Sequence, residues 1–366
     1  MPPLSRHVSL PESNDTARLP PSTGNLGQTN RIRPFRGSSL RPQKDPVLQS
    51  ALRRIVERLG VERMVSSRRL GIAVADITDP QRPRFAGVNE GQELFAASLP
   101  KIGVLVGALC LVDRGQLDLD ARLDQQFSTG EREQLVSAVL GSRFERRCFS
   151  PLLRGKGCPV PAADDRTGWR VALGGLTLHE LLGVMMGYSS NAVPAFLHRH
   201  VGKRRLQDIL RQCGLFDVDT DTGLWLGKFY GQDPRSERIY HRGGSQNATA
   251  LQVARFYYLV ETGQLFSAEL SRVAAQAMSA LTVDGRPRMG HKFMRFLGSV
   301  VPRPGRVLRK SGTTSFNQTH ADSVLVETRD AQGRVRKYIV VMLARGQGAA
   351  GLAEKLIEDV HTTMAV

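Results

Sequence analysis

A serine and a lysine stand three positions apart, as Ser98 and Lys101, in an almost continuously apolar stretch over residues 94–112. If a helix begins near Ser98, positions i and i+3 lie on one face and within reach of each other. Burial favours the neutral form of an amine, so a buried lysine can act as a base near neutral pH. A serine hydroxyl becomes a nucleophile when a neighbouring base takes its proton. The pair therefore predicts nucleophilic catalysis by Ser98 with Lys101 as its base.

The same spacing also has a purely structural interpretation, an N-cap serine followed by a lysine whose ammonium reaches water. Ser-x-x-Lys is expected by chance about once in a chain of this length, so the motif alone does not decide. The apolar residues after it surround the helix axis, which favours a helix buried in a globular core. Pro100 and Lys101 interrupt the apolar run, and residues 102–112 are too short to cross a bilayer.

Lys310-Ser311-Gly312 ends a predicted strand and is the only Lys-[Ser/Thr]-Gly in the chain. A cation at this place can hold a substrate carboxylate, and the glycine permits close approach of the backbone. The alternative is an ordinary strand end.

Ser189-Ser190-Asn191 lies between two predicted helices and offers a second hydroxyl and a carboxamide. Ser-x-Asn also occurs at Ser245 and Ser315, so this motif is weak alone. Only the copy at Ser189 stands between two predicted helices and in the order that the other motifs require.

The chain has 366 residues and a formal net charge of +17, which raises the question of anionic partners. The basic residues are spread over three regions, residues 31–41, 143–156 and 303–310. No helix-turn-helix, zinc-finger or RNA-recognition pattern accompanies them, so we interpret the charge as a solvated surface and expect no nucleic-acid partner. No apolar segment follows Met1 as in a secretory signal peptide, and no transmembrane segment is predicted.

The four cysteines, Cys110, Cys148, Cys158 and Cys213, show no spacing typical of zinc, and we expect neither a metal nor a cofactor. Cys110 lies in the predicted buried helix and is expected to be an inert core residue. Cys148 and Cys158 flank a short loop and could form a local disulfide in an oxidising compartment, which the sequence leaves open.

Residues 1–45 are rich in Pro, Ser, Asn and Arg without periodicity, which predicts a disordered basic arm. Apolar periodicity predicts helices over residues 46–60, 178–186, 192–200, 206–213, 249–258, 267–280 and 352–364. Strands are predicted over residues 70–75, 84–88, 307–310, 323–328 and 338–343, and the last two form a hairpin around the turn at residues 331–333. Residues 113–170 are irregular, and residues 216–247 show no clear periodicity. This order predicts an α/β layer built from both chain ends, with an inserted helical lobe.

With its three motifs in this order, the chain resembles the penicillin-recognising serine enzymes, most closely the class A β-lactamases. Their motif set is Ser-x-x-Lys, Ser-Asp-Asn and Lys-Thr-Gly. The resemblance covers residues 46–366 except about 122–169, which we cannot match. It implies an α+β fold in which a five-stranded antiparallel sheet with flanking helices meets a helical lobe at the active-site cleft. The catalytic domain is then residues 46–366, with a sheet lobe (46–112 and 296–366) and a helical lobe (113–295).

The resemblance also implies a role for each matched residue. Ser98 would be the acylated nucleophile and Lys101 its base or proton relay. Ser189 would pass a proton to the leaving group, and Asn191 would bind the substrate amide. In the remaining motif, Lys310-Ser311-Gly312, the side chains of Lys310 and Ser311 would bind the substrate carboxylate. The backbone N–H groups of Ser98 and Thr313 would form the oxyanion hole.

Two departures from the family pattern matter. Ser190 replaces the usual aspartate, which is expected to change the support of the loop rather than the chemistry. The deacylating glutamate of class A enzymes, expected in a Glu-x-x-Leu-Asn segment before the helix that follows Asn247, has no counterpart. Residues 225–228 fall at about its place, and the nearest carboxylates are Asp233 and Glu237. Each can be a solvated loop charge, and Glu237 is the candidate for activating water.

Three functions are compatible with these observations. The first is a serine hydrolase that turns over β-lactams or related amides, including peptidoglycan-like ones. The second is a penicillin-binding peptidase that is acylated but releases its product slowly. The third is a catalytically silent protein whose basic surface binds an anionic polymer. The first is favoured because all three motifs keep their chemically active groups. The family analogy further implies a periplasmic or secreted protein, and we expect a monomer.

Overall fold

The computed structural model describes residues 43–230, 245–279, 297, 301, 305–314, 318–346 and 349–364. The predicted disordered arm lies almost entirely outside the described residues, and Asp233 and Glu237 lie outside them as well. Within the described part, no helix combines the length and the hydropathy that crossing a bilayer needs.

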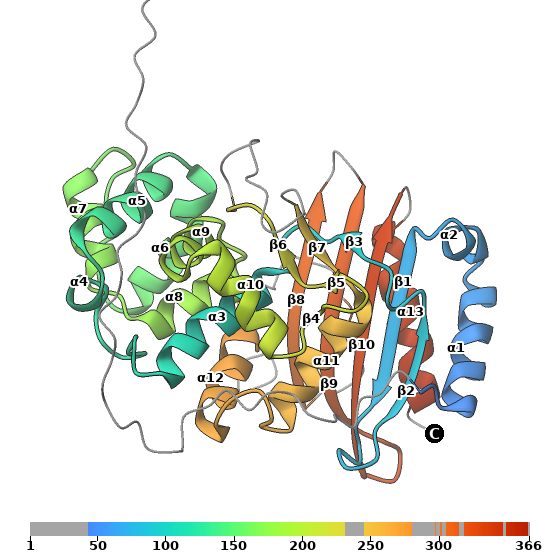
Figure 1. Ribbon diagram of the computed structural model, residues 1–366. Helices are drawn as coiled ribbons and strands as arrows, with labels where there is room; N and C mark the ends of the chain where they lie inside the picture. Colours follow the sequence, from blue (N-terminus) through green and yellow to red (C-terminus); the bar gives the residue numbers. More distant parts are fainter. Residues whose placement is uncertain are drawn as a thin grey trace, which may run out of the picture. The chain divides into compact units, whose positions relative to one another are not determined.

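A five-stranded antiparallel sheet has the strand order β2-β1-β10-β9-β8 (Figure 1). The strands are β1 (Leu70–Asp76), β2 (Arg84–Val88), β8 (Arg306–Thr314), β9 (Thr319–Arg329) and β10 (Val335–Arg345). The two chain halves join where β1 pairs with β10, in the register that sets Leu70 opposite Ala344. The predicted α+β fold with a five-stranded antiparallel sheet is confirmed.

Both faces of this sheet are covered, which explains why its central strands read as continuous apolar runs. Successive side chains of a strand point to opposite faces. On β1, Ile72 therefore packs in one hydrophobic cluster with Leu52 of α1 (Pro46–Arg58) and Leu356 of α13 (Ala349–Met364). Ala73 joins the other cluster with Phe256 of α11 (Ala250–Glu261).

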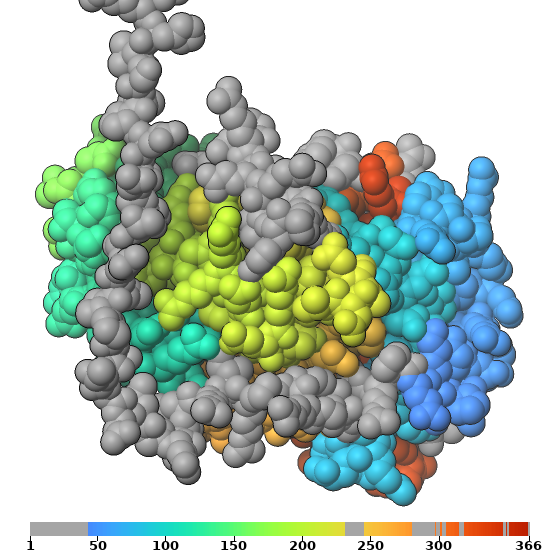
Figure 2. Space-filling model, in the orientation of Figure 1, coloured from blue at the N-terminus to red at the C-terminus, as the bar shows by residue number. Residues whose placement is uncertain are grey.

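A group of helices lies on the side of the sheet away from α1 and α13 (Figure 1). Its helices are α3 (Lys101–Asp113), α4 (Leu123–Gln126), α5 (Thr129–Leu140), α6 (Arg143–Gly155), α7 (Arg166–Gly174), α8 (Leu178–Gly187), α9 (Ala192–Val201), α10 (Lys203–Gln212) and α12 (Ala268–Met278). On the face shown in Figure 2, α10 and the yellow segment after it lie at the surface between the green helices and the cyan strand segment.

Short elements complete the described fold. Helix α2 (Glu62–Ser66) precedes β1, and a three-stranded sheet contains β3 (Leu94–Phe95), β6 (Trp225–Leu226) and β7 (Gln246–Ala248). Strands β4 (Phe216–Asp217) and β5 (Thr222–Gly223) form a separate pair. Strand β3 leads directly into the turn that carries Ser98, so the small sheet fixes where that turn begins.

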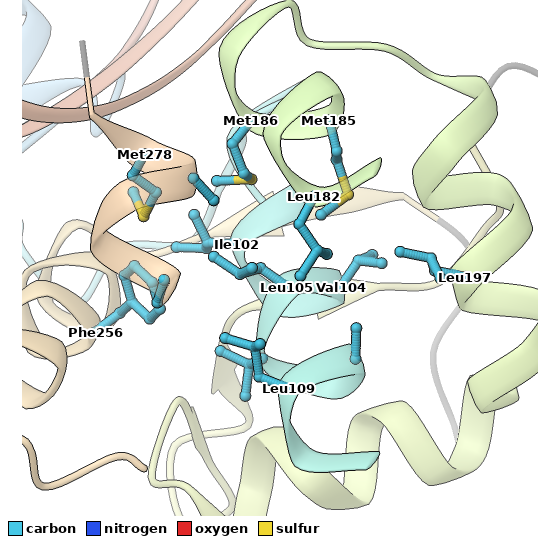
Figure 3. Packing of buried hydrophobic residues seen from close by; sticks show 14 of the residues in the cluster. Ile102, Val104, Leu105, Leu109, Leu182, Met185, Met186, Leu197, Phe256 and Met278 are labelled. Atoms are coloured by element: carbon cyan, nitrogen blue, oxygen red, sulfur yellow. The ribbon is translucent and has the colours of Figure 1, made fainter. Parts of the chain in front are cut away.

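Helix α3 is the centre of the larger hydrophobic cluster. Side chains of α8, α9, α11 and α12 surround it, as Figure 3 shows for Leu182, Leu197, Phe256 and Met278. Residues 101–111 of α3 are all buried, so the prediction of a core helix with apolar residues all round its axis is confirmed. A helix held on every side gives the residues at its start a rigid base.

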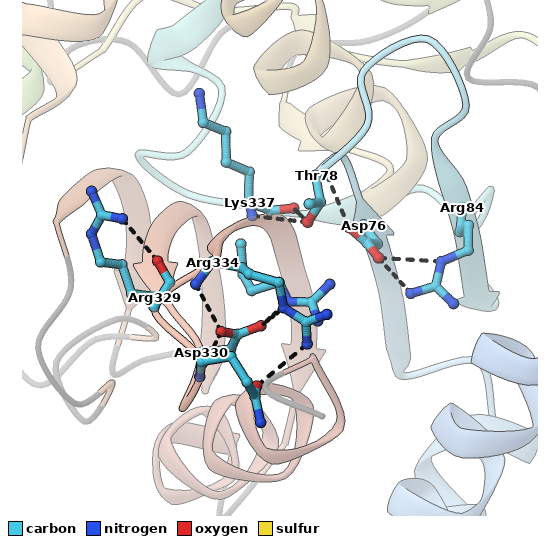
Figure 4. A network of polar contacts seen from close by, with 10 residues as sticks. Asp76, Thr78, Arg84, Arg329, Asp330, Arg334 and Lys337 are labelled. Carbon is cyan, nitrogen blue, oxygen red and sulfur yellow. Dashed lines mark hydrogen bonds and ion pairs between the residues drawn. The ribbon is translucent and has the colours of Figure 1, made fainter.

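Polar contacts fix the strand connections at one end of the sheet (Figure 4). The Asp330 carboxylate accepts hydrogen bonds from the backbone N–H and the Nε atom of Arg334, at 2.9 and 2.8 Å. These bonds close the turn between β9 and β10, where the sequence predicts a hairpin. Asp76 and Arg84 form an ion pair across β1 and β2.

The structure corrects three predictions about elements. Residues 113–170, where the sequence shows no regular pattern, are largely helical. A capping box formed by Ser128 and Glu131 begins α5, and α6 has an apolar stripe that is interrupted in the sequence by arginines and Pro151. Strand β8 does not end at Gly312 but pairs with β9 as far as Thr314. Helix α3 begins at Lys101, and residues 97–100 before it form a turn, whose first i→i+3 bond joins the Leu99 N–H to the Ala96 carbonyl.

Candidate active site

Ser98 and Lys101 lie side by side where the turn before α3 becomes helix. The Nζ atom of Lys101 is 3.0 Å from the Ser98 hydroxyl oxygen, as the i and i+3 spacing predicts. The lysine side chain has no exposed surface. The alternative of a lysine that reaches water is therefore wrong.

Two residues of the Ser189–Asn191 segment hold the same amine. The Nζ atom of Lys101 donates to the Ser189 carbonyl at 2.7 Å and to the Asn191 Oδ1 atom at 2.8 Å. The Ser189 hydroxyl is 3.3 Å from Nζ. The segment that the sequence places between two helices, now α8 and α9, thus reaches the start of α3.

Burial lowers the pKa of Lys101 to about 7, and the negative charge of Glu145 opposes this lowering. An amine with this pKa is neutral in a large fraction of molecules at neutral pH, whereas a solvated lysine is almost fully protonated. Lys101 therefore has the proton affinity that a general base requires.

Lys310, on strand β8, contacts the Ser189 hydroxyl from the side of the sheet. Its Nζ atom donates to the Ser189 Oγ atom and to the Ser311 carbonyl, both at 2.9 Å. Burial and the charges of Lys101 and Arg309 lower the pKa of Lys310 well below its usual value, while Asp322 opposes them. Two amines and two hydroxyls thus form one chain of contacts, Ser98–Lys101–Ser189–Lys310.

Two residues of the site have a left-handed backbone. Ala97 has a φ of 48° and Ser189 a φ of 61°, although neither is glycine. Such a conformation costs about 1–3 kcal/mol and persists where surrounding contacts enforce it. Both residues adjoin the groups just described, so the strain lies where the hydroxyls of Ser98 and Ser189 are presented.

Gly312 brings strand β8 against the turn before α3. A Cβ atom on Gly312 would lie 2.5 Å from the backbone nitrogen of Ser98 and 2.7 Å from that of Leu99. The sequence prediction that this glycine permits close backbone approach is confirmed in geometry. Thr313, the next residue of β8, is exposed beside this contact.

The Ser311 hydroxyl lies against a buried ion pair. Arg309 Nη2 donates to the Ser311 Oγ atom at 2.7 Å, and Arg309 Nε lies 3.4 Å from Asp322 Oδ1. Ser311 is itself buried. The guanidinium thus orients the Ser311 hydroxyl, while its own charge is balanced by Asp322.

Sequence reasoning missed Glu145, a buried carboxylate of α6. Its Oε2 atom accepts from the Ser190 hydroxyl at 2.5 Å, and its Oε1 atom accepts from the Asn191 backbone N–H at 2.8 Å. The signal that could have indicated α6 is the apolar stripe Cys148, Phe149 and Leu153. Nothing in the local sequence indicates that this helix reaches residues 190 and 191.

Tyr230 was also missed. Its ring centroid lies 4.9 Å from the Lys101 Nζ atom, and its hydroxyl donates to the Ala97 carbonyl at 3.2 Å. Burial raises the pKa of this phenol well above its usual value, so the ring is neutral beside the amine. Tyr230 thus lies at the site, with its ring against the Lys101 amine, and it follows directly on β6 and residues 227–229.

The cysteines and possible metal ligands take no visible part. Cys148 and Cys158 are both free thiols, so the local disulfide that the sequence left open is not formed. Among the described residues, no group of histidine, cysteine, aspartate and glutamate side chains could hold a metal ion.

Comparisons with known proteins identify the family and the fold of this chain. The sequence model of the beta-lactamase enzyme family matches residues 50–364. A beta-lactamase from Sphaerobacter thermophilus has a TM-score of 0.54 and 17% sequence identity, over 86% of this chain and 94% of that chain. A beta-lactamase from Chitinophaga pinensis has a TM-score of 0.54 and 15% identity, over 84% and 98%.

The structure of PBP-A is similar to the same degree, with a TM-score of 0.54 and 14% identity over 88% of this chain and 98% of that chain. A comparison with curated protein sequences gave no match. At these identities the solved structures show a common fold. Because the family match covers most of the chain, this protein belongs to the beta-lactamase enzyme family.

Proposed function

We propose that this protein is a serine hydrolase that opens β-lactams or related cyclic and peptidoglycan-like amides through an acyl-enzyme on Ser98. The observation that carries the proposal is the amine of Lys101, which contacts Ser98, Ser189 and Asn191 at once. The proposed catalytic groups are Ser98, Lys101, Ser189 and Lys310. Neither a metal nor a cofactor enters the proposal.

In the acylation step, neutral Lys101 takes the hydroxyl proton as the Ser98 oxygen attacks the substrate carbonyl carbon. The contact of 3.0 Å and the pKa of about 7 support this role. The new oxyanion would be held by the backbone N–H groups of Ser98 and Thr313. Among the described residues, none accepts a hydrogen bond from the Ser98 N–H, which leaves it available.

When the C–N bond breaks, the leaving nitrogen must receive a proton. The Ser189 hydroxyl would supply it and recover one from Lys101, whose Nζ atom is 3.3 Å away. Lys310 donates to the same hydroxyl and stabilises negative charge that develops on it. The proton taken from Ser98 thereby returns to the product.

Binding would use the remaining motif residues. Asn191 holds Lys101 through its Oδ1 atom, so its Nδ2 group is left to bind a substrate carbonyl. Lys310 and Ser311 would hold the substrate carboxylate, with the Ser311 hydroxyl oriented by Arg309.

The decisive experiment is intact-protein mass spectrometry after incubation with a penicillin. We expect a mass increase equal to the penicillin on the wild type and none on Ser98→Ala. A chromogenic cephalosporin would report turnover in the same samples. A wild type that is neither labelled nor active would overturn the proposal and leave a silent binding protein with a basic surface.

A second candidate, an enzyme that is acylated but releases product slowly, is favoured by one specific observation. Both oxygens of Glu145, the carboxylate whose charge acts on Lys101 among the described residues, are occupied by Ser190 and Asn191. A carboxylate held in this way is poorly suited to activate the water that hydrolyses the acyl-enzyme. A label on Ser98 that persists for hours with little cephalosporin turnover would select this candidate.

A further inference from the structure

The Glu145 carboxylate is buried without an ionic partner in contact. Its side chain lies on α6 and the residue is 4% exposed. Its oxygens accept hydrogen bonds from two neutral donors, Ser190 and Asn191. No lysine or arginine among the described residues forms an ion pair with it. A buried charge is costly unless its contacts compensate it, so this arrangement needs an explanation.

The two hydrogen bonds fix the segment that carries two proposed site residues. The Ser190 hydroxyl donates to Glu145 and accepts from the Val193 N–H at 3.2 Å, in the first turn of α9. The Asn191 N–H is held by the second carboxylate oxygen. Ser189 and Asn191 flank Ser190, so one carboxylate orients the hydroxyl and the carboxamide that contact Lys101.

The origin of this carboxylate is what distinguishes the chain. The enzymes that it resembles carry an aspartate at the middle of Ser-Asp-Asn, where this chain has Ser190. Glu145 comes from α6, 45 residues earlier, in the segment 122–169 where the motif-based resemblance found no counterpart. The short Ser190 side chain leaves room for the longer Glu145 side chain of α6, and the two form a hydrogen bond.

We propose that Glu145 is a positioning residue for acyl transfer, which holds the Ser189–Asn191 segment from a separate helix in place of an aspartate at position 190. This inference rests on the proposed function of Ser98. It assigns a role to α6, which is then part of the active-site architecture rather than a surface insertion. The charge of Glu145 also opposes the lowering of the Lys101 pKa, which provides a separate readout.

The test measures the rate of labelling of the full chain by a fluorescent penicillin and by a fluorophosphonate, from pH 5 to pH 9. We expect Glu145→Gln to lower the labelling rate by about 100-fold, because the Ser189–Asn191 segment loses its support. The midpoint of the acidic limb should move below pH 7, since removal of a negative charge lowers the Lys101 pKa further. A purely structural defect would lower the rate without moving this midpoint.

Two further variants make the test specific. Glu145→Ala combined with Ser190→Asp restores a carboxylate at the point of contact. This double variant should be labelled at least about tenfold faster than Glu145→Ala alone. Glu133→Gln is the matched control, because Glu133 lies on α5 and pairs with Arg166 and Arg170 at the surface. It should label like the wild type.

The outcomes separate the two proposals. If the wild type is labelled on Ser98 and Glu145→Gln matches it in rate and pH profile, the role of Glu145 is wrong and the function stands. If Glu145→Gln fails to fold, absence of rescue by Ser190→Asp in the double variant overturns the inference. If neither reagent labels the wild type, the function and the role of Glu145 fail together.

Discussion

Gly312 and Ser98 are so close that a methyl group on Gly312 would lie 2.5 Å from the backbone nitrogen of Ser98. Cβ atoms in real structures essentially never come this near to a backbone atom. The contact joins β8 to the turn before α3, and therefore joins the last motif of the chain to the first. A substitution that pushes β8 away from this turn therefore also moves Lys310 and Thr313, which lie on β8, away from Ser98.

We therefore expect Gly312→Ala to reduce penicillin labelling of Ser98 by about 100-fold or more, because the backbone N–H groups of the proposed oxyanion hole are displaced. Gly305→Ala, just before β8, is the control, since its Cβ would make only an ordinary contact of 3.6 Å with Glu327. Time-resolved labelling measures both variants. A Gly312→Ala protein that labels at the wild-type rate would show that the close approach does not matter for acylation.

The pH dependence of acylation should follow Lys101. Its pKa in the folded protein is about 7, so the amine is protonated below this value and neutral above it. A base acts in its neutral form, so the labelling rate should rise about tenfold per pH unit below 7 and level off above it. A rate that is constant between pH 5 and pH 8 would contradict Lys101 as the base.

Lys101→Arg tests the same role without removing the positive charge. A guanidinium cannot lose its proton in this pH range, so labelling should fall by about 10²–10⁴-fold. Lys156→Arg is the control, because Lys156 pairs with Glu180 at the surface and should tolerate arginine. Equal labelling of both variants and the wild type would exclude a lysine base.

Lys310 should matter most for substrates that carry a carboxylate. Lys310→Ala is expected to lower kcat/KM for a penicillin by about 10–100-fold, the usual effect of losing a charge-assisted hydrogen bond. The penicillin methyl ester should lose much less in Lys310→Ala than the free acid. If acid and ester lose activity equally, Lys310 acts through Ser189 alone and does not bind the carboxylate.

The stability of the helical group should depend on the core around α3. Leu109 is fully buried there, and its replacement by alanine should lower the free energy of unfolding by about 2.7–5 kcal/mol. Val47→Ala is the exposed comparison, since Val47 is 70% exposed and should change the free energy by less than about 0.5 kcal/mol. Urea unfolding measures both. A loss below 1 kcal/mol for Leu109→Ala would mean that α3 is not the packed centre of the fold.

Several features of this protein follow from short-range sequence patterns alone. The i and i+3 spacing of Ser98 and Lys101 already sets their mutual reach, and a buried helix accounts for the altered proton affinity. The capping box of Thr177 and Glu180 marks the start of α8, as the structure has it. The hairpin of β9 and β10 follows from two apolar runs around a glycine turn. Each depends on neighbours within a few residues, where periodicity and turn chemistry act.

The tertiary structure alone decided which distant groups meet at the site. Glu145 reaches Ser190, Tyr230 lies over Lys101, and Gly312 abuts Ser98, across separations that no local pattern encodes. A hydrophobic stripe shows that a helix packs, but its neighbour depends on how all buried side chains fill the core together. For this reason the sequence predicts Ser98 as the nucleophile and Lys101 as its base, whereas only the tertiary structure brings Glu145 of α6 to the segment beside them.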